Sequence, residues 1–133
     1  MGAPRKNIGS RWEIEVGASL LIIEIAPSKP GSMHGVWPTS RNLFIKGHHV
    51  DGSNTRLALL ECLCEEMGRI VTYERLCTIA GHSSSNAREK HILHQHLLWI
   101  NSMLKRQKLP CVLAVARDVG YALCLIPPAR LIG

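Results

Sequence analysis

The chain has 133 residues, of which 46% are hydrophobic, and its 16 lysines and arginines outweigh its 10 acidic residues to give a net charge of +6. This is the length of one domain, and the apolar content supports a core that needs no disulfide or metal. No apolar run, Ala18 to Ile23 included, approaches the roughly 20 residues that cross a bilayer, so we expect no membrane attachment.

Cysteine usage favours a reducing compartment. The chain has five cysteines, an odd number, and no recognisable signal peptide, which favours a cytoplasmic location over secretion. No CxxC pair is present to start a zinc site, and we expect all five to be small core residues: Cys62, Cys64, Cys77, Cys111 and Cys124.

The N-terminus predicts a flexible basic tail. Residues 1–10 are small, polar and basic, and they contain little that would hold them against a core. Arg5, Lys6 and Arg11 resemble the basic arms that add phosphate contacts in other DNA-binding folds, although such tails often do nothing measurable. Residues 11–133 are expected to form a single domain.

Residues 11–50 predict a small antiparallel sheet. Trp12, Ile14 and Val16 alternate with two glutamates, which is the pattern of a half-buried strand, and residues 19–25 follow as a mostly apolar strand. Glycines and prolines interrupt residues 27–40. Residues 42–50 then predict a strand pair that turns at Lys46 and Gly47. Gly17 is expected to mark a turn or a bulge between the first two strands.

After residue 52 the hydrophobic period becomes helical. Leu59, Leu60, Leu63 and Met67 share one face of a first helix, and Gly68 is placed to end it.

A second, shorter helix follows an extended link at residues 70–71. Thr72 is placed to cap its N-terminus, Leu76, Ile79 and Ala80 are expected to face inward, and Gly81 stops the helix.

The third and longest helix is expected over residues 86–107. Asn86 and Glu89 have the spacing of a capping box. Four apolar residues at i, i+4, i+7 and i+11 predict its buried face: Leu93, Leu97, Ile100 and Leu104.

A hairpin is expected after this helix. Pro110 prevents the helix from continuing, and residues 111–115 and 121–126 are rich in apolar and β-branched side chains. Gly120 is expected to supply a turn conformation that other residues avoid, and Tyr121 to pack the hairpin against the helices.

The predicted fold class is α+β. A sheet over residues 11–50, three helices over 54–107 and a C-terminal wing hairpin over 111–126 form the order of a winged helix-turn-helix.

From about residue 42 to residue 125 the chain resembles the winged-helix effector domains of OmpR/PhoB-type bacterial response regulators. One segment that carries the resemblance is the Leu-rich first helix with the run that follows it, GRIVTYERL at residues 68–76. In the third helix, Leu98, Ile100 and Met103 fall on apolar positions of the family's recognition helix. The wing is similar to the family's Arg-Gly-x-Gly-Tyr-x-Leu, and reads RDVGYAL at residues 117–123. The resemblance implies a winged helix on its own, because this length leaves no room for a receiver domain.

The first functional hypothesis is a transcription regulator that binds double-stranded DNA. Residues 75–133 carry eight basic residues against Glu89 and Asp118, whereas residues 54–74 carry two arginines against four glutamates. We expect the third helix to enter the major groove and the wing to contact the neighbouring minor groove or phosphates, with a homodimer on repeated half-sites. The candidate DNA-contacting residues are Arg88, Lys90, Trp99, Asn101, Ser102, Lys105, Arg106 and Arg117.

The second hypothesis is a winged helix that binds a protein of the transcription machinery instead of DNA. The family's recognition helix carries several arginines where this chain has Trp99, Asn101, Ser102 and Leu104. Asp118 also stands beside Arg117, either as its ion-pair partner or as a charge that repels phosphate. Trp99 fits either a half-buried core position or an exposed contact.

Catalysis is not expected. The sequence has no Gly-rich phosphate loop, no nucleophile motif and no paired carboxylates placed for acid-base chemistry. His91, His94 and His96 lie near Glu89, but surface histidines at such spacing usually bind nothing, and we expect no metal and no cofactor.

Overall fold

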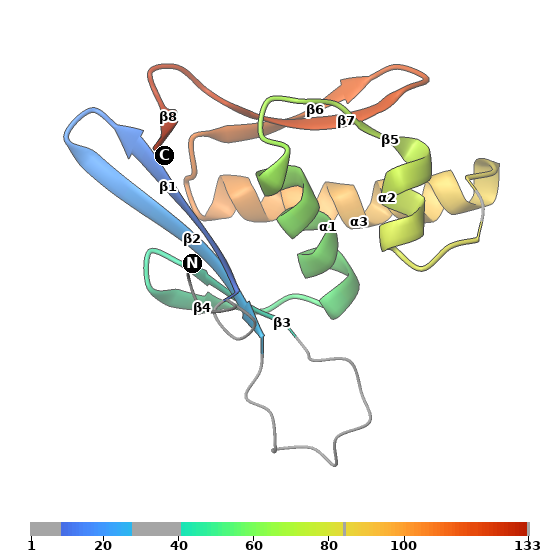
Figure 1. Cartoon of the computed structure of the whole chain (residues 1–133), viewed down its shortest axis with the longest axis horizontal. Helices are drawn as coiled ribbons and strands as arrows, with labels where there is room; N and C mark the ends of the chain where they lie inside the picture. The colour runs from blue at the N-terminus through green and yellow to red at the C-terminus, as the bar shows by residue number, and fades with distance from the viewer. Residues whose placement is uncertain (1–8, 28–40, 84, 133) are drawn as a thin grey trace, which may run out of the picture.

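The computed structural model describes residues 9–27, 41–83 and 85–132, and over these residues the chain is an α+β protein with three helices and antiparallel sheets (Figure 1). A five-stranded sheet has the order β4-β3-β2-β1-β8, and a three-stranded sheet has the order β5-β7-β6. The elements are, in chain order, β1 (Ser10–Val16), β2 (Ser19–Pro27), β3 (Arg41–Ile45), β4 (His48–Val50), α1 (Asn54–Glu65), β5 (Val71–Thr72), α2 (Tyr73–Ile79), α3 (Ala87–Arg106), β6 (Cys111–Ala116), β7 (Gly120–Leu125) and β8 (Arg130–Ile132).

The N-terminal sheet forms as the alternating pattern predicts. β1 pairs with β2, β2 with β3 and β3 with β4, all antiparallel. Two left-handed residues, Lys46 at φ 55° and Gly47 at φ 81°, make the tight turn between β3 and β4. The alternate side chains that face the helices are fully buried: Ile14, Ile23, Ile25, Leu43 and Ile45.

The N-terminal boundary and the C-terminal strand differ from the sequence-based expectation. Ser10, assigned to the flexible tail, begins β1, while residues 1–8 of that tail and residues 28–40 of the expected break lie outside the described residues. The unpredicted strand β8 pairs with the free edge of β1, where Arg130 Nε donates to Glu15 Oε1 at 2.7 Å. Its three residues are all exposed, so no buried apolar pattern marks the strand in the sequence. The strand forms because the edge of β1 is there to pair with it.

Helix α1 buries the three leucines that were predicted to share one of its faces, Leu59, Leu60 and Leu63. Ser53 caps it, with its Oγ accepting from the backbone N–H of Arg56 at 3.3 Å. The helix ends at Glu65, so the expectation that Met67 belongs to it is wrong. Gly68, at φ 82°, turns the chain toward β7, where its N–H donates to the carbonyl of Leu123 at 2.8 Å.

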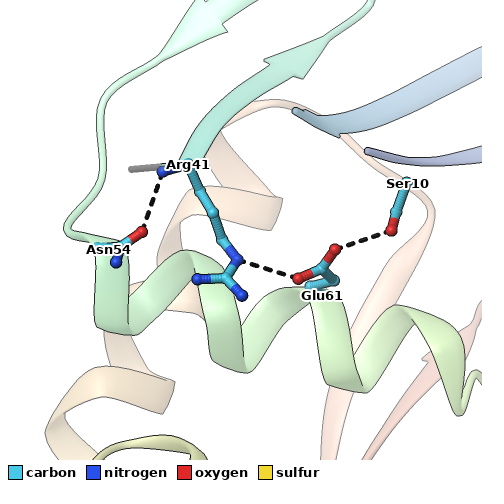
Figure 2. Close-up of polar contacts among 4 residues, drawn as sticks. All are labelled: Ser10, Arg41, Asn54 and Glu61. Atoms are coloured by element: carbon cyan, nitrogen blue, oxygen red, sulfur yellow. Dashed lines mark hydrogen bonds and ion pairs between the residues drawn. The ribbon is translucent and has the colours of Figure 1, made fainter. Parts of the chain in front are cut away.

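One carboxylate of α1 joins this helix to two strands of the sheet (Figure 2). Glu61 Oε1 accepts from Arg41 Nε of β3 at 3.0 Å, and Glu61 Oε2 accepts from Ser10 Oγ of β1 at 2.8 Å. The backbone N–H of Arg41 also donates to Asn54 Oδ1 in the first turn of α1, at 3.0 Å. The side chain of Glu61 is only 22% exposed, so water competes little for these hydrogen bonds. The contacts therefore hold α1 against the sheet.

Thr72 ends β5 and caps α2, as expected. Its Oγ1 accepts from the backbone N–H of Arg75 at 3.2 Å. Leu76 is fully buried, whereas Ile79 and Ala80 are only partly covered, and Gly81 follows at φ 89°.

Helix α3 is the central element of the fold. Asn86 Oδ1 accepts from the backbone N–H of Glu89 at 3.0 Å, which confirms the predicted N-terminal cap. The four predicted apolar residues are fully buried, together with Met103. They pack against α1, α2 and β6, and in Figure 1 the helix runs beneath the β6–β7 hairpin.

The expected role of Gly120 is wrong, although the predicted hairpin forms. The left-handed residue of its turn is Asp118, at φ 62°, and Gly120 is not among the glycines with positive φ. A Cβ on Gly120 would lie 1.9 Å from the carbonyl oxygen of Val71, because β5 pairs with β7 at this point. Glycine is needed here for close approach of two backbones.

Tyr121 packs the hairpin against the helices, as predicted. Its ring meets Tyr73 edge to face, with 5.7 Å between centroids, and its Oη hydrogen-bonds His94 Nδ1 of α3 at 3.0 Å.

The cysteines are free thiols, and all but the half-buried Cys124 are buried. Burial raises the pKa of the Cys111 thiol to about 11. The thiol therefore stays protonated and serves as a small core group.

None of the helices in the described residues has the length and apolar composition to cross a membrane.

Gly120→Ala is expected to destabilise the protein by about 1–3 kcal/mol, because the added methyl overlaps the backbone of β5. Gly17→Ala is the control, since a Cβ there meets nothing within 4 Å and only the left-handed φ of 59° is strained. Urea unfolding of both variants measures the difference. Equal losses would contradict the close-approach explanation.

Glu61→Ala is expected to lower the free energy of unfolding by about 1–3 kcal/mol, since it removes two hydrogen bonds and leaves Arg41 without its carboxylate. Glu13→Ala is the matched control: it removes a carboxylate from the exposed pair with Arg11, which is worth at most about 1 kcal/mol. Urea unfolding that ranks the two variants in the opposite order would contradict a stabilising role for the contacts of Glu61 with Arg41 and Ser10.

Candidate nucleic-acid interface

The face of α3 opposite its buried side chains is exposed along the whole helix. Residues three or four apart share a helix face, so a continuous row of side chains forms there. We call this row the outer stripe, and its members are Arg88, His91, Gln95, Leu98, Ser102 and Lys105.

The outer stripe is basic at both ends and carries no lysine, arginine or carboxylate between them. Arg88 lies in the first turn of α3, and Lys105 lies in the last turn beside exposed Arg106. At 1.5 Å per residue, Arg88 and Lys105 are about 26 Å apart along the axis. Between them, Gln95 Nε2 lies 3.4 Å from His91 Nε2.

The turn of the β6–β7 hairpin lies at the same end of the molecule as the N-terminus of α3 (Figure 1). The backbone N–H of Tyr73 donates to the carbonyl of Val119 at 3.0 Å, which holds the turn beside α2. Arg117 and Asp118 are both exposed in this turn, and within the described part of the chain they form no ion pair. The alternative of a salt bridge between these neighbours is therefore not realised.

Basic side chains are paired in one part of the molecule and unpaired in another. In residues 9–27, 41–83 and 85–132, every lysine or arginine that forms an ion pair lies in the five-stranded sheet, in the α1–β5 loop or in α2: Arg11, Arg41, Arg69, Arg75 and Arg130. Glu66 alone holds Arg75 at 3.1 Å and Arg69 at 3.8 Å. The described basic residues for which the structure shows no partner lie in α3, in the loop that follows it or in the hairpin turn: Arg88, Lys105, Arg106, Lys108 and Arg117.

The structure turns three of the candidate residues away from the outer stripe. Asn101 Oδ1 accepts from the backbone N–H of Leu113 in β6 at 3.5 Å. Trp99 is half-buried, with the guanidinium carbon of Arg56 5.2 Å from its ring centroid. Lys90 Nζ lies 4.8 Å from the ring centroid of Tyr73. Arg88, Lys90, Ser102, Lys105, Arg106 and Arg117 are exposed.

Sequence reasoning did not select His91, Gln95 and Leu98, which occupy the centre of the outer stripe. Leu98 is 51% exposed, so it is no core residue despite its match to an apolar position of the resembled family. The missed signal was the helical period, because these positions lie opposite the buried i, i+4, i+7 row.

A small pocket lies between α3 and the β6–β7 hairpin, beside the outer stripe. Its volume is about 80 Å³, and its lining is His94, Leu97, Leu98, Asn101, Leu113, Val115 and Tyr121. Leu98 and Val115 are 51% and 60% exposed, so their apolar side chains reach solvent next to it.

The histidines of α3 have separate partners. His91 contacts Gln95, His94 hydrogen-bonds Tyr121, and His96 Nδ1 accepts from Arg56 Nε at 3.2 Å. No group of three or more histidine, cysteine or carboxylate side chains is arranged to hold a metal ion in the ranges that the structure describes.

Neither a protein-family model nor a curated protein matches this chain.

His96 is expected to titrate below the ordinary histidine range, because burial first, and then Arg56 and His82, lower its pKa. Arg56→Ala should move the pKa of His96 back toward about 6.5. The Hε1 chemical shift followed by NMR against pH measures it. Arg69→Ala, which removes a distant exposed arginine, should leave the titration unchanged.

The same shift makes stability depend on pH. Because the unfolded chain binds this proton more readily, the free energy of unfolding should fall as pH drops from about 6.5 through the lowered pKa of His96. His96→Gln should flatten this dependence. Urea unfolding at several pH values that shows the same slope in both proteins would contradict it.

Proposed function

We propose that this chain is a winged helix-turn-helix protein that binds double-stranded DNA. α3 lies in the major groove, and the β6–β7 hairpin is a wing that contacts the adjacent phosphates or minor groove. The order of sheet, three helices and hairpin supports this reading, as does the sequence resemblance to OmpR/PhoB-type effector domains.

The observation that carries the proposal is the partition of basic residues. Acidic residues pair with arginines of the sheet, the α1–β5 loop and α2, while Arg88, Lys105, Arg106, Lys108 and Arg117 have no such partner among the described residues. Exposed cations without protein partners are the groups that displace counterions from a phosphate backbone.

The length and width of α3 also suit the major groove of DNA. The helix has 20 residues, and a helix about 10–12 Å across fits a major groove about 12 Å wide. Basic residues about 26 Å apart bracket the outer stripe, so both ends can meet phosphates while its centre faces base edges.

The free thiols agree with action in the cytoplasm, where a reducing environment keeps them unpaired. A homodimer on repeated half-sites is the assembly that such a domain would use to extend its footprint.

A second candidate function, binding a protein of the transcription machinery, is favoured by one specific observation. Exposed Leu98 and Val115 flank the small pocket between α3 and β6, and apolar side chains of this kind suit a protein contact. A partner that copurifies at fixed stoichiometry, is lost on Leu98→Ala and is indifferent to Arg117→Ala would support this function.

Binding to duplex DNA should weaken with salt, with a slope of log K against log salt near −0.9 for each phosphate contact. Lys105→Ala and Arg117→Ala should each flatten the slope by nearly one contact. Arg130→Ala is the matched control, since it removes the same charge from a residue paired with Glu15 in the sheet. Fluorescence anisotropy at several salt concentrations measures the slopes, and a wild-type slope near zero would refute the proposal.

A further inference from the structure

Resting on the proposed DNA binding, we infer that the centre of the outer stripe selects two adjacent A·T base pairs, with Gln95 reading the adenine of one pair and Leu98 contacting the thymine methyl of the other. The flanking basic residues contribute affinity without selecting a sequence.

Gln95 has the chemistry that recognises adenine. A carboxamide donates to N7 and accepts from the N6 amino group of adenine in the major groove. Gln95 is exposed in the middle of α3, and its side-chain amide lies 3.4 Å from His91 Nε2. This contact restricts the amide before DNA arrives, which lowers the entropy lost on binding.

Leu98 supplies the apolar contact. It is 51% exposed beside Val115 on the rim of the small pocket, so a thymine methyl in the groove would replace water against its side chain. Thymine is the base that presents a methyl group in the major groove.

The spacing of the two side chains fits neighbouring base pairs. Gln95 and Leu98 are three positions apart on the helix, a rise of about 4.5 Å, while stacked bases are about 3.4 Å apart.

The same stretch is ill-suited to G·C pairs. Guanine is read by arginine or lysine and cytosine by a carboxylate, and neither type occurs on the outer stripe between Arg88 and Lys105. The basic side chains sit at the ends, where phosphates pass.

The test begins with selection of bound duplexes from a random pool, followed by base analogues at each selected A·T pair. Replacing thymine by uracil removes only the methyl and should weaken wild-type binding by about fourfold. Replacing adenine by 7-deazaadenine removes only N7 and should weaken it by about fivefold. Exchanging the whole pair for G·C should weaken it by about 5- to 150-fold.

Single variants assign each effect to its residue. Leu98→Ala should abolish the response to uracil and keep the response to 7-deazaadenine, and Gln95→Ala should do the reverse. Leu20→Ala is the matched control, because this leucine of β2 is also 51% exposed but lies in the five-stranded sheet. It should respond as wild type does.

Several results would overturn the inference. These are selection of G·C pairs at the centre of the footprint, no response of wild-type protein to either analogue, or responses that persist unchanged in Leu98→Ala and Gln95→Ala. A duplex-binding protein with a steep salt slope but no A·T preference would refute only this inference. A salt slope near zero on every duplex would refute the proposed function as well.

Discussion

The burial of one apolar face of α3 is the constraint on which the rest of the structure depends. Leu93, Leu97, Ile100 and Leu104 are fully buried against α1, α2 and the hairpin strand β6. Burying a side chain of this size is worth about 1.5–3 kcal/mol, so rotating the helix about its axis would forfeit several such contributions at once. The orientation of the core face therefore also fixes the outer stripe, which faces solvent because nothing else in the described fold covers it.

The elements around α3 hold their positions through a few close contacts. Gly120 lets β7 approach β5 more closely than any side chain would allow, and Tyr121 reaches from the same strand to His94 of α3. On the opposite side, Glu61 ties α1 to two strands of the five-stranded sheet. The hairpin turn and the start of α3 are thereby kept at one end of the molecule, so their exposed arginines can act on a single ligand.

The distribution of charged residues indicates which kind of ligand this surface can bind. Carboxylates of the sheet, of α1 and of the loop after it pair with nearby arginines, and residues 75–133 have only Glu89 and Asp118 to offset their basic residues. An exposed helix with free cations at its ends and polar or apolar side chains at its centre is suited to a ligand whose edge is anionic and whose interior carries hydrogen-bonding and methyl groups. Duplex DNA has that character.

The sequence by itself determined the order of N-terminal strands, three helices and hairpin, the helix caps at Thr72 and Asn86 and the buried row of α3, because these depend on local periodicity and on side chains that bond to their own backbone. It did not determine the strand β8, whose partner β1 is remote in the chain, or the reason for Gly120, which is the proximity of β5. Nor did it reveal that Asn101 bonds to β6 while Gln95 and Leu98 face solvent. Helical period limits which side chains share a face, but only packing against other elements decides which of those faces remains exposed.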